Sequence, residues 1–333
     1  MPSWWLTRGV LARLLLPLAW LFAALTLARR ALYRTGLLRA HRVDVPVIVV
    51  GNLIAGGAGK TPVVLALVEL LRTRGYTPGI VSRGHGGGVD GVLLLQASTP
   101  ARLAGDEPTL LHLRSRAPVA VGRDRVAAAR ALLGAHPDVD VLVADDGLQH
   151  WRLARDAQVL VFDERGAGNG WLLPAGPLRE SMPDQVPPRT LVVYNAGAPT
   201  TPLPGGIGTR RLQGLIALAD WRHGGQASGA TLDALRGRPA IAAAGVARPE
   251  RFFSMLRERG LTISPLPLPD HHPYITLPWP ADTADVVVTE KDAIKLDAAA
   301  VGRTRVWVAP LDFSLGADFA PALLALLPTP RSR

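Results

Sequence analysis

The fold of this chain is decided by one stretch, which reads Val47-Ile48-Val49-Val50-Gly51-Asn52-Leu53-Ile54-Ala55-Gly56-Gly57-Ala58-Gly59-Lys60-Thr61-Pro62. The β-branched residues at its start predict a strand, the glycines predict a tight turn, and a helical pattern continues to about residue 74. That order is typical of a phosphate-binding loop, in which backbone N–H groups surround phosphate oxygens, a lysine reaches the outer phosphates and a hydroxyl meets Mg²⁺. We therefore expect a nucleoside triphosphate to bind here.

The loop departs from the standard spacing, because Ile54 stands where a glycine is expected five residues before Gly59. Residues 56–61 also resemble the loop of the MinD/ParA ATPases, although Ala55 replaces the signature lysine of that group. A glycine-rich turn with a stray lysine is the structural alternative. On the first interpretation, the nucleotide ligands are Gly56, Gly57, Ala58, Gly59, Lys60 and Thr61.

Lysine is rare in this chain, and its rarity adds weight to the loop. Of 37 basic residues only Lys60, Lys291 and Lys295 are lysines. A planar guanidinium substitutes poorly for a compact, flexible ammonium, so we expect lysine to be kept where an ammonium is needed. Lys60 fits that expectation, and the other two suggest roles near a cleft.

Composition limits the possible classes of protein. A length of 333 residues allows two domains with a large core. The chain has no cysteine, which leaves no disulfide or thiolate metal site. The net charge of +10 indicates a polyanionic partner such as a phosphorylated substrate or anionic lipid. Only 5% of residues are aromatic and no recognition motif is found, so we expect no nucleic-acid partner.

A hydrophobic segment lies near the amino terminus, where residues 14–28 carry no charge. Fifteen residues of helix reach roughly 22 Å at ~1.5 Å each, short of a hydrocarbon core of ~30 Å. Counted from Gly9, with Arg13 snorkelling, the segment reaches spanning length. Trp4, Trp5 and Trp20 are of a type that favours membrane interfaces. We predict a membrane anchor here.

The arginines around this segment predict its orientation. Two precede it, and five follow it, which predicts that the body of the protein lies in the cytoplasm. A cleaved signal peptide and a helix buried in the core are the alternatives. The five arginines that follow the segment are Arg29, Arg30, Arg34, Arg39 and Arg42.

Strand-like and helical runs alternate through the body of the chain, which predicts an α/β fold. The sheet should be a P-loop NTPase-like parallel sheet flanked by helices, with ligands beyond the carboxyl ends of its strands. A Pro/Gly-rich passage at 196–208 suggests a linker to a smaller second α/β domain. We predict an anchoring helix at 1–35, a P-loop core domain at 36–200 and the second domain at 201–333. The expected strands are 47–50, 79–81, 92–95, 119–121, 141–144, 159–162 and 191–194, then 240–244, 286–288 and 306–308.

Two carboxylates, Asp145 and Asp146, stand at the end of an apolar strand and are followed by Gln149-His150. In nucleotide-binding enzymes a carboxylate at this place holds Mg²⁺ and offsets charge on the phosphates. A solvated turn is the alternative.

Further polar clusters follow other strands. Ser82-Arg83 could hold another anion. Asp106 either caps the helix that follows it or acts as a base for an attacking hydroxyl, with Glu107 beside it. Asp270-His271 could bind a metal, but a histidine that pairs with a carboxylate across the cleft is the better interpretation. Thr289-Glu290-Lys291-Asp292 contains a helix cap at Thr289.

Taken together and in order, these motifs resemble the tetraacyldisaccharide 4′-kinase family over most of the chain. The resemblance implies phosphorylation by ATP, with Mg²⁺, of the 4′-hydroxyl of a tetraacylated glucosamine disaccharide 1-phosphate, a lipid A precursor. The matching motifs are Gly51-Asn52, Gly56 to Pro62, Ser82-Arg83-Gly84, Gly105-Asp106-Glu107-Pro108, Asp145 to His150, Gly170 to Glu180, Asp270-His271 and Thr289 to Asp292.

The resemblance also implies roles for single residues. Asp106 matches the residue proposed to activate the hydroxyl, with His271 as its partner; Lys60 and Asp146 complete the catalytic set. Gly86-Gly87-Gly88 departs from the family's usual continuation after Ser82-Arg83-Gly84, which puts contacts from that loop in doubt. The remaining assignments are metal ligation by Thr61, Asp145, Glu107 and Gln149, and substrate binding by Ser82, Arg83, His150 and Arg179.

Two other functions are compatible with parts of the pattern. One is a membrane-associated regulatory ATPase of MinD/ParA type, against which Ala55 and the Asp106 and His271 motifs count. The other is a GTPase that uses residues 289–292 to read the base, although the spacing matches poorly.

Overall fold

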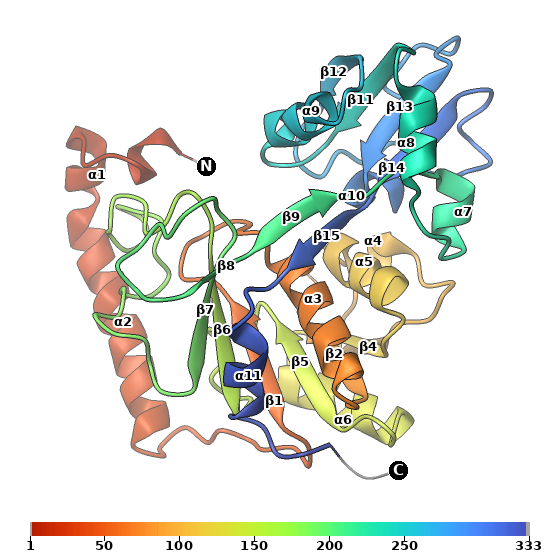
Figure 1. Ribbon diagram of the computed structural model, residues 1–333. Coiled ribbons are helices and arrows are strands. Elements are labelled where there is room, and N and C mark those ends of the chain that lie inside the picture. The colour runs from red at the N-terminus through yellow and green to blue at the C-terminus, as the bar shows by residue number, and fades with distance from the viewer. Residues whose placement is uncertain (1, 85, 331–333) are drawn as a thin grey trace.

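The computed structural model describes residues 2–84 and 86–330, which form two α/β lobes joined by a pair of strands (Figure 1). The α/β class, the parallel sheet with its flanking helices and the smaller second lobe are all as predicted.

The large lobe is built on an eight-stranded sheet in the order β3-β4-β2-β5-β1-β6-β7-β8. Every neighbouring pair is parallel except β3 and β4. The strands are β1 (Val47–Gly51), β2 (Pro78–Ser82), β3 (Val92–Leu94), β4 (Val119–Gly122), β5 (Val141–Asp145), β6 (Ala157–Phe162), β7 (Thr190–Tyr194) and β8 (Gly206–Ile207).

Helices cover both faces of this sheet, so β1 is buried on both sides. Ile48 and Val50 pack into one apolar cluster with α3 (Lys60–Thr73) and α5 (Asp106–Ser115). Val47 and Val49 alternate with them and pack into a second cluster with α6 (Arg125–Ala135). This is why a continuous β-branched run forms a central parallel strand. The short helix α4 (Ala101–Ala104) precedes α5.

The small lobe contains a five-stranded sheet in the order β10-β14-β13-β11-β12, in which only β10 is antiparallel to its neighbour. Its strands are β10 (Ile216–Ala217), β11 (Ala240–Ala244), β12 (Ile263–Pro267), β13 (Asp285–Thr289) and β14 (Arg305–Ala309). Its helices are α7 (Leu218–Arg222), α8 (Gly229–Leu235), α9 (Pro249–Glu258) and α10 (Glu290–Ala293).

The chain crosses between the lobes twice, in β9 (Thr209–Leu212) and β15 (Leu311–Ser314), which pair antiparallel. After β15 the chain returns to the large sheet, where α11 (Phe319–Leu324) places Phe319 and Leu323 in the same apolar cluster as β1. The predicted domain limits at 36–200 and 201–333 remain a proposal. The last helix, α11, packs with the large lobe although it lies at the end of the chain.

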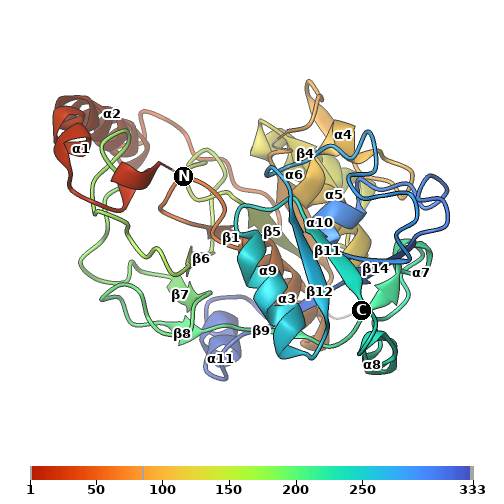
Figure 2. The ribbon, with the colours of Figure 1, turned by 90° about the horizontal axis from the view of Figure 1, so that it is seen from above.

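The amino-terminal segment forms η1 (Ser3–Trp5), α1 (Val10–Leu14) and α2 (Leu16–Arg34), and α2 runs along the outside of the large lobe (Figures 1 and 2). Trp20 is 66% exposed and Leu25 61%, so the helix is not buried in the core. In the described part of the chain, no helix has both the length and the apolar character needed to cross a bilayer. The expected spanning length is therefore not confirmed.

Candidate active site

The glycine-rich loop joins β1 to α3, and its backbone is held from within by Asn52. The Asn52 amide donates to the carbonyls of Ile54, at 2.7 Å, and Gly56, at 3.2 Å. Ile54 is buried among the apolar side chains behind the loop, which explains why a glycine is not needed there. Gly59 has φ 72° and is the N-cap of α3, a conformation that favours glycine.

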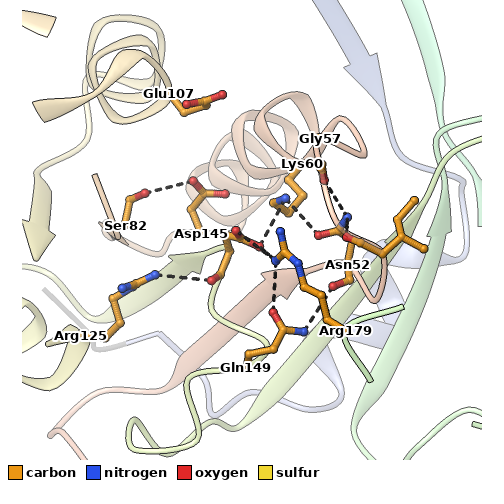
Figure 3. Close-up of polar contacts among 12 residues, drawn as sticks. Asn52, Gly57, Lys60, Ser82, Glu107, Arg125, Asp145, Gln149 and Arg179 are labelled. Atoms are coloured by element: carbon orange, nitrogen blue, oxygen red, sulfur yellow. Dashed lines mark hydrogen bonds and ion pairs between the residues drawn. The ribbon is translucent and has the colours of Figure 1, made fainter. Parts of the chain in front are cut away.

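Lys60 is the first residue of α3 and points to the acidic pair (Figure 3). Its Nζ donates to Asn52 Oδ1 at 3.1 Å and lies 3.3 Å from Asp146 Oδ1. Its side chain is only 12% exposed. The lysine is thus fixed between the loop and the carboxylates, where a nucleotide's outer phosphates would meet it.

Asp145 ends β5 and lies almost completely buried beside Lys60. Ser82, at the end of the neighbouring β2, donates to its Oδ2 at 3.1 Å, whereas its Oδ1 has no hydrogen-bond partner. Burial raises the pKa of Asp145 to about 6, with Lys60 opposing and Asp146 adding to the rise. A buried carboxylate oxygen without a partner, in the cleft that Thr61 at the start of α3 also lines, fits a site for a cation.

These residues fit Mg²⁺ held together with a nucleotide. Within residues 2–84 and 86–330, no three His, Asp or Glu side chains gather into a metal site made by protein alone. Mg²⁺ commonly takes only one or two carboxylates and completes its shell with substrate phosphates and waters. Asp145 and Thr61 would hold the ion, which would then offset charge on the phosphates.

Asp146 adopts a left-handed conformation, with φ 47°. Burial opposes its ionisation, but Lys60 and Arg179 outweigh burial, and the pKa of Asp146 is lowered. Arg179 Nη1 lies 3.3 Å from Asp146 Oδ1, and the buried Arg125 reaches the Asp146 carbonyl from behind at 3.5 Å (Figure 3). Asp146 therefore stays ionised and fixes Lys60.

Gln149 and Arg179 connect the acidic pair to the loop and to residues 170–180. Gln149 donates to the Asn52 carbonyl at 3.4 Å and accepts from Arg179 at 3.3 Å. The backbone N–H of Arg179 donates to the Leu53 carbonyl. These contacts occupy the Gln149 amide with protein partners, and its role at a metal remains a prediction.

His150 lies behind the acidic pair and stays neutral. Burial lowers its pKa to about 4, with the charge of Arg125 acting in the same direction. Its Nε2 is buried without a hydrogen-bond partner. Arg83 is exposed and lines the same cleft as the phosphate loop and the acidic pair. The substrate-binding roles of Ser82, Arg83, His150 and Arg179 remain predictions.

Asp106 is the first residue of α5 and pairs with two residues of the small lobe. His271 Nδ1 lies 2.9 Å and Lys295 Nζ 3.1 Å from Asp106 Oδ2. The predicted pairing of a histidine with a carboxylate across the cleft is present. The alternative that Asp106 caps its helix is wrong, because the N-cap is Gly105 and no side chain caps the helix.

Glu107, the next residue, binds Lys291 Nζ through Oε1 at 2.6 Å. Burial opposes its ionisation, but Lys291 outweighs burial and the pKa of Glu107 is lowered. Its charge is near enough to raise the pKa of Asp145. The predicted cap at Thr289 is confirmed, since its side chain accepts from the Asp292 N–H. Metal binding by Glu107 remains a prediction.

Lys60, the acidic pair, Glu107, Arg179 and His271 all line one cleft of about 1470 Å³ between the lobes. One wall carries the phosphate loop and the acidic pair, and the opposite wall carries Asp270 and His271. The cleft continues to α2, where Phe22 and Leu27 line it. It is long enough to bring a nucleotide and an amphipathic acceptor to the same place.

Sequence reasoning missed several residues of the site. Asn52 has no sequence signal beyond its place in the Gly51-Asn52 motif, yet its side chain binds both the loop backbone and Lys60. Arg125 has no local signal that separates it from the other arginines of the chain, although it is 3% exposed. For Lys295 the rarity of lysine was the available signal, and the structure places it on Asp106.

This fold and site are those of a phosphate-loop α/β phosphotransferase, which passes the terminal phosphate of a nucleoside triphosphate to an acceptor in the cleft between its lobes. The model of the family described as Tetraacyldisaccharide-1-P 4'-kinase matches residues 11–328, and the chain belongs to that family.

Individual relatives agree with this membership. The chain is 58% identical over 324 residues to the tetraacyldisaccharide 4'-kinase of Methylibium petroleiphilum, covering 96% of this chain and 90% of the relative. It is 55% identical over 331 residues to that of Leptothrix cholodnii, covering 98% and 95%.

A solved structure agrees as well. The fold of this chain is similar to that of a crystal structure described as "apo" form LpxK from Aquifex aeolicus in complex with ATP. The TM-score is 0.80 and the sequence identity 27%, and the match covers 96% of this chain and 100% of that one. The family membership does not favour the regulatory ATPase as an alternative.

Proposed function

We propose that the protein transfers the γ-phosphate of ATP to the 4′-hydroxyl of a tetraacylated glucosamine disaccharide 1-phosphate. The observation that carries the proposal is the meeting of two sets of groups in one cleft. Lys60 and Asp145 mark the nucleotide side, and the Asp106–His271 pair faces them from the acceptor side. Family membership supplies the identity of the acceptor.

The residues divide the work of phosphoryl transfer as follows. Lys60 and the loop N–H groups bind and orient the phosphates, and Asp146 holds the Lys60 ammonium in place. His271 and Lys295 both contact Asp106 Oδ2, and the described residues offer no hydrogen bond to Oδ1. Asp106 Oδ1 is therefore the atom that takes the hydroxyl proton as the oxygen bonds to phosphorus and ADP leaves.

The same proposal places the protein at the inner membrane, with the catalytic lobes on the cytoplasmic side. An acylated acceptor leaves a bilayer at a cost of about 0.8 kcal/mol per exposed CH₂. Exposed apolar side chains on α2 adjoin the cleft, and Arg29 and Arg30 line it beside Phe22. These features support a lipid surface at α2, from which the acceptor reaches the cleft without leaving the lipid.

Labelled ATP incubated with the protein and a membrane lipid extract tests the activity. We expect label to enter a glycolipid. Release of free phosphate alone would instead support a nucleotide-hydrolysing switch.

Sedimentation with liposomes tests the membrane contact. Deletion of residues 2–29 should reduce the fraction that sediments, because it removes the exposed apolar face. A truncated protein that still sediments fully would mean that other surfaces bind the lipid.

A further inference from the structure

The nucleotide side of the cleft contains a guanidinium that the roles above leave unexplained. Arg210 lies on β9, the first of the two strands that cross between the lobes. It lines the cleft together with residues 56–61 of the phosphate loop. A side chain at Gly59 would collide with Arg210 Nη2 and with the Asn195 amide, so both groups lie directly against the N-terminus of α3.

The guanidinium of Arg210 has no partner of opposite charge. Among the described residues it makes no ion pair, and its Nε is buried without a hydrogen-bond partner. Other arginines on this wall are paired: Arg248 and Arg251 each bind Glu164 at 2.7 Å. Arg165 is likewise bound to Asp163, at 2.8 Å. Three arginines thus share the two carboxylates Asp163 and Glu164, and Arg210 adds a further positive charge that makes no ion pair among the described residues.

Its surroundings make this cation unfavourable in the absence of an anion. The N-terminus of α3 carries positive partial charge. Burial lowers the pKa of Arg210 to about 10; the charge of Arg251 acts in the same direction, and the charges of Glu164 and Asp163 oppose the shift without reversing it. Asn195, which follows β7, is 1% exposed and donates to the Ala58 carbonyl, so it holds the loop beside Arg210.

The order of the strands decides which part of a nucleotide meets Arg210. Strand β5, with the acidic pair, adjoins one side of β1, whereas β6, β7 and β8 follow on the other side. The transferred phosphate must lie on the β5 side, near Asp145 and Asp106. The phosphates that remain with the nucleoside then lie on the β7–β9 side, where Arg210 is.

We infer that Arg210 binds the non-transferred phosphates of the nucleotide and so couples the crossing strand β9 to the phosphate loop. The inference rests on the proposed function for the identity of the ligand as ATP. It makes Arg210 a nucleotide ligand contributed from outside the glycine-rich loop, which no loop motif would reveal.

Calorimetric titration of the full chain with ATP and with ADP, without lipid acceptor, tests this inference. Arg210→Gln should weaken both affinities by about tenfold or more, and by the same factor, since ADP keeps the phosphates concerned. The matched control is Arg211→Gln, which removes the same charge from the next residue of β9, where the side chain is exposed. It should change both affinities by less than about twofold.

Thermal unfolding separates this role from a structural one. Without nucleotide, Arg210→Gln should melt no lower than the wild type, because it removes a cation that lacks a partner. Unchanged affinity for both nucleotides would overturn the inference, and so would a loss confined to ATP. A wild-type protein that binds ATP through Arg210 but labels no glycolipid would refute the proposed function and leave this inference standing.

Discussion

The two lobes use the same local design, a central parallel strand followed by a helix with a lysine in its first turn, for different purposes. In the large lobe β1 leads to Lys60, whose partners Asn52 and Asp146 belong to the same lobe and surround a cleft. In the small lobe β13 leads to Lys291, whose partner Glu107 belongs to the other lobe. The end of β1 therefore presents a charge to a ligand, whereas the end of β13 joins the two lobes.

The difference lies in whether the charges around the helix start are already neutralised by protein. Beside Lys291, Glu290 is buried against Arg114 and accepts from Trp221 Nε1 at 3.0 Å. Asp292 accepts from the Gly245 N–H. Around Lys60, Asp145 keeps a buried oxygen without a partner. The two helix starts thus differ in one respect: a buried oxygen without a partner lies beside Lys60, whereas the carboxylates beside Lys291 are bound by protein groups. We call the contacts of Arg114, Glu290 and Lys291 between the lobes the joint.

The largest expected effect is at Lys60. Lys60→Ala should lower kcat by about a thousandfold or more, because the ammonium that meets the developing charge is lost. Lys60→Arg should be almost as inactive, since a planar fork does not fit between Asn52 and Asp146. Turnover assays paired with circular dichroism check both variants. Arg74→Ala, at the other end of α3, is the control, and near-normal turnover of Lys60→Ala would refute the loop assignment.

Asp106 comes next. Asp106→Asn should lower the rate of the chemical step by about a hundredfold or more while ATP affinity changes little, because the proton acceptor is lost. His271→Gln should give a smaller loss, and the double variant should be no slower than Asp106→Asn alone. Single-turnover kinetics with nucleotide titration measure this. Lost ATP affinity with an intact chemical step would make Asp106 a nucleotide ligand instead.

The joint is tested at Arg114. Arg114→Ala leaves the buried carboxylate of Glu290 without its cation and should lower the free energy of unfolding by roughly 2 kcal/mol. Urea denaturation followed by tryptophan fluorescence measures the loss. Arg116→Ala removes an exposed arginine two residues away and should cost much less. Equal stability losses in the two variants would contradict the role given to Glu290.

The smallest effect is expected at Lys291. Its pair with Glu107 is partly exposed, with 35% of the lysine side chain accessible, so Lys291→Ala should cost less than about 1 kcal/mol in the same denaturation experiment. If transfer is abolished while stability holds, Lys291 belongs to the chemistry and the contrast between the two strand ends fails.

Local sequence predicted the features whose causes are local. A β-branched run, a set of glycines and a lysine specify β1, the loop and the start of α3, and an apolar run ending in two aspartates specifies β5. The Asp106–His271 pairing, 165 residues apart in sequence, required chemical reasoning about which side chains could meet across a cleft.

Long-range causes escaped prediction. Asn52 is an amide with no periodic signal, and Arg125 is buried only because the acidic pair lies above it. The two-residue strands β8 and β10 are too short to leave a pattern, and they form because neighbouring strands offer them an edge. The predicted helix cap at Asp106 was wrong because Asp106 is the first residue of the helix itself. Its carboxylate contacts the small lobe instead.

The return of the chain to the large sheet has a consequence for how the protein is made. Because Phe319 and Leu323 complete the apolar cluster beneath β1 and α3, the lobe that begins first during synthesis is finished last. A ribosome that stalls after β15 would release a chain whose second lobe is whole and whose nucleotide lobe still exposes an apolar face. Burial of that face therefore depends on the final helix.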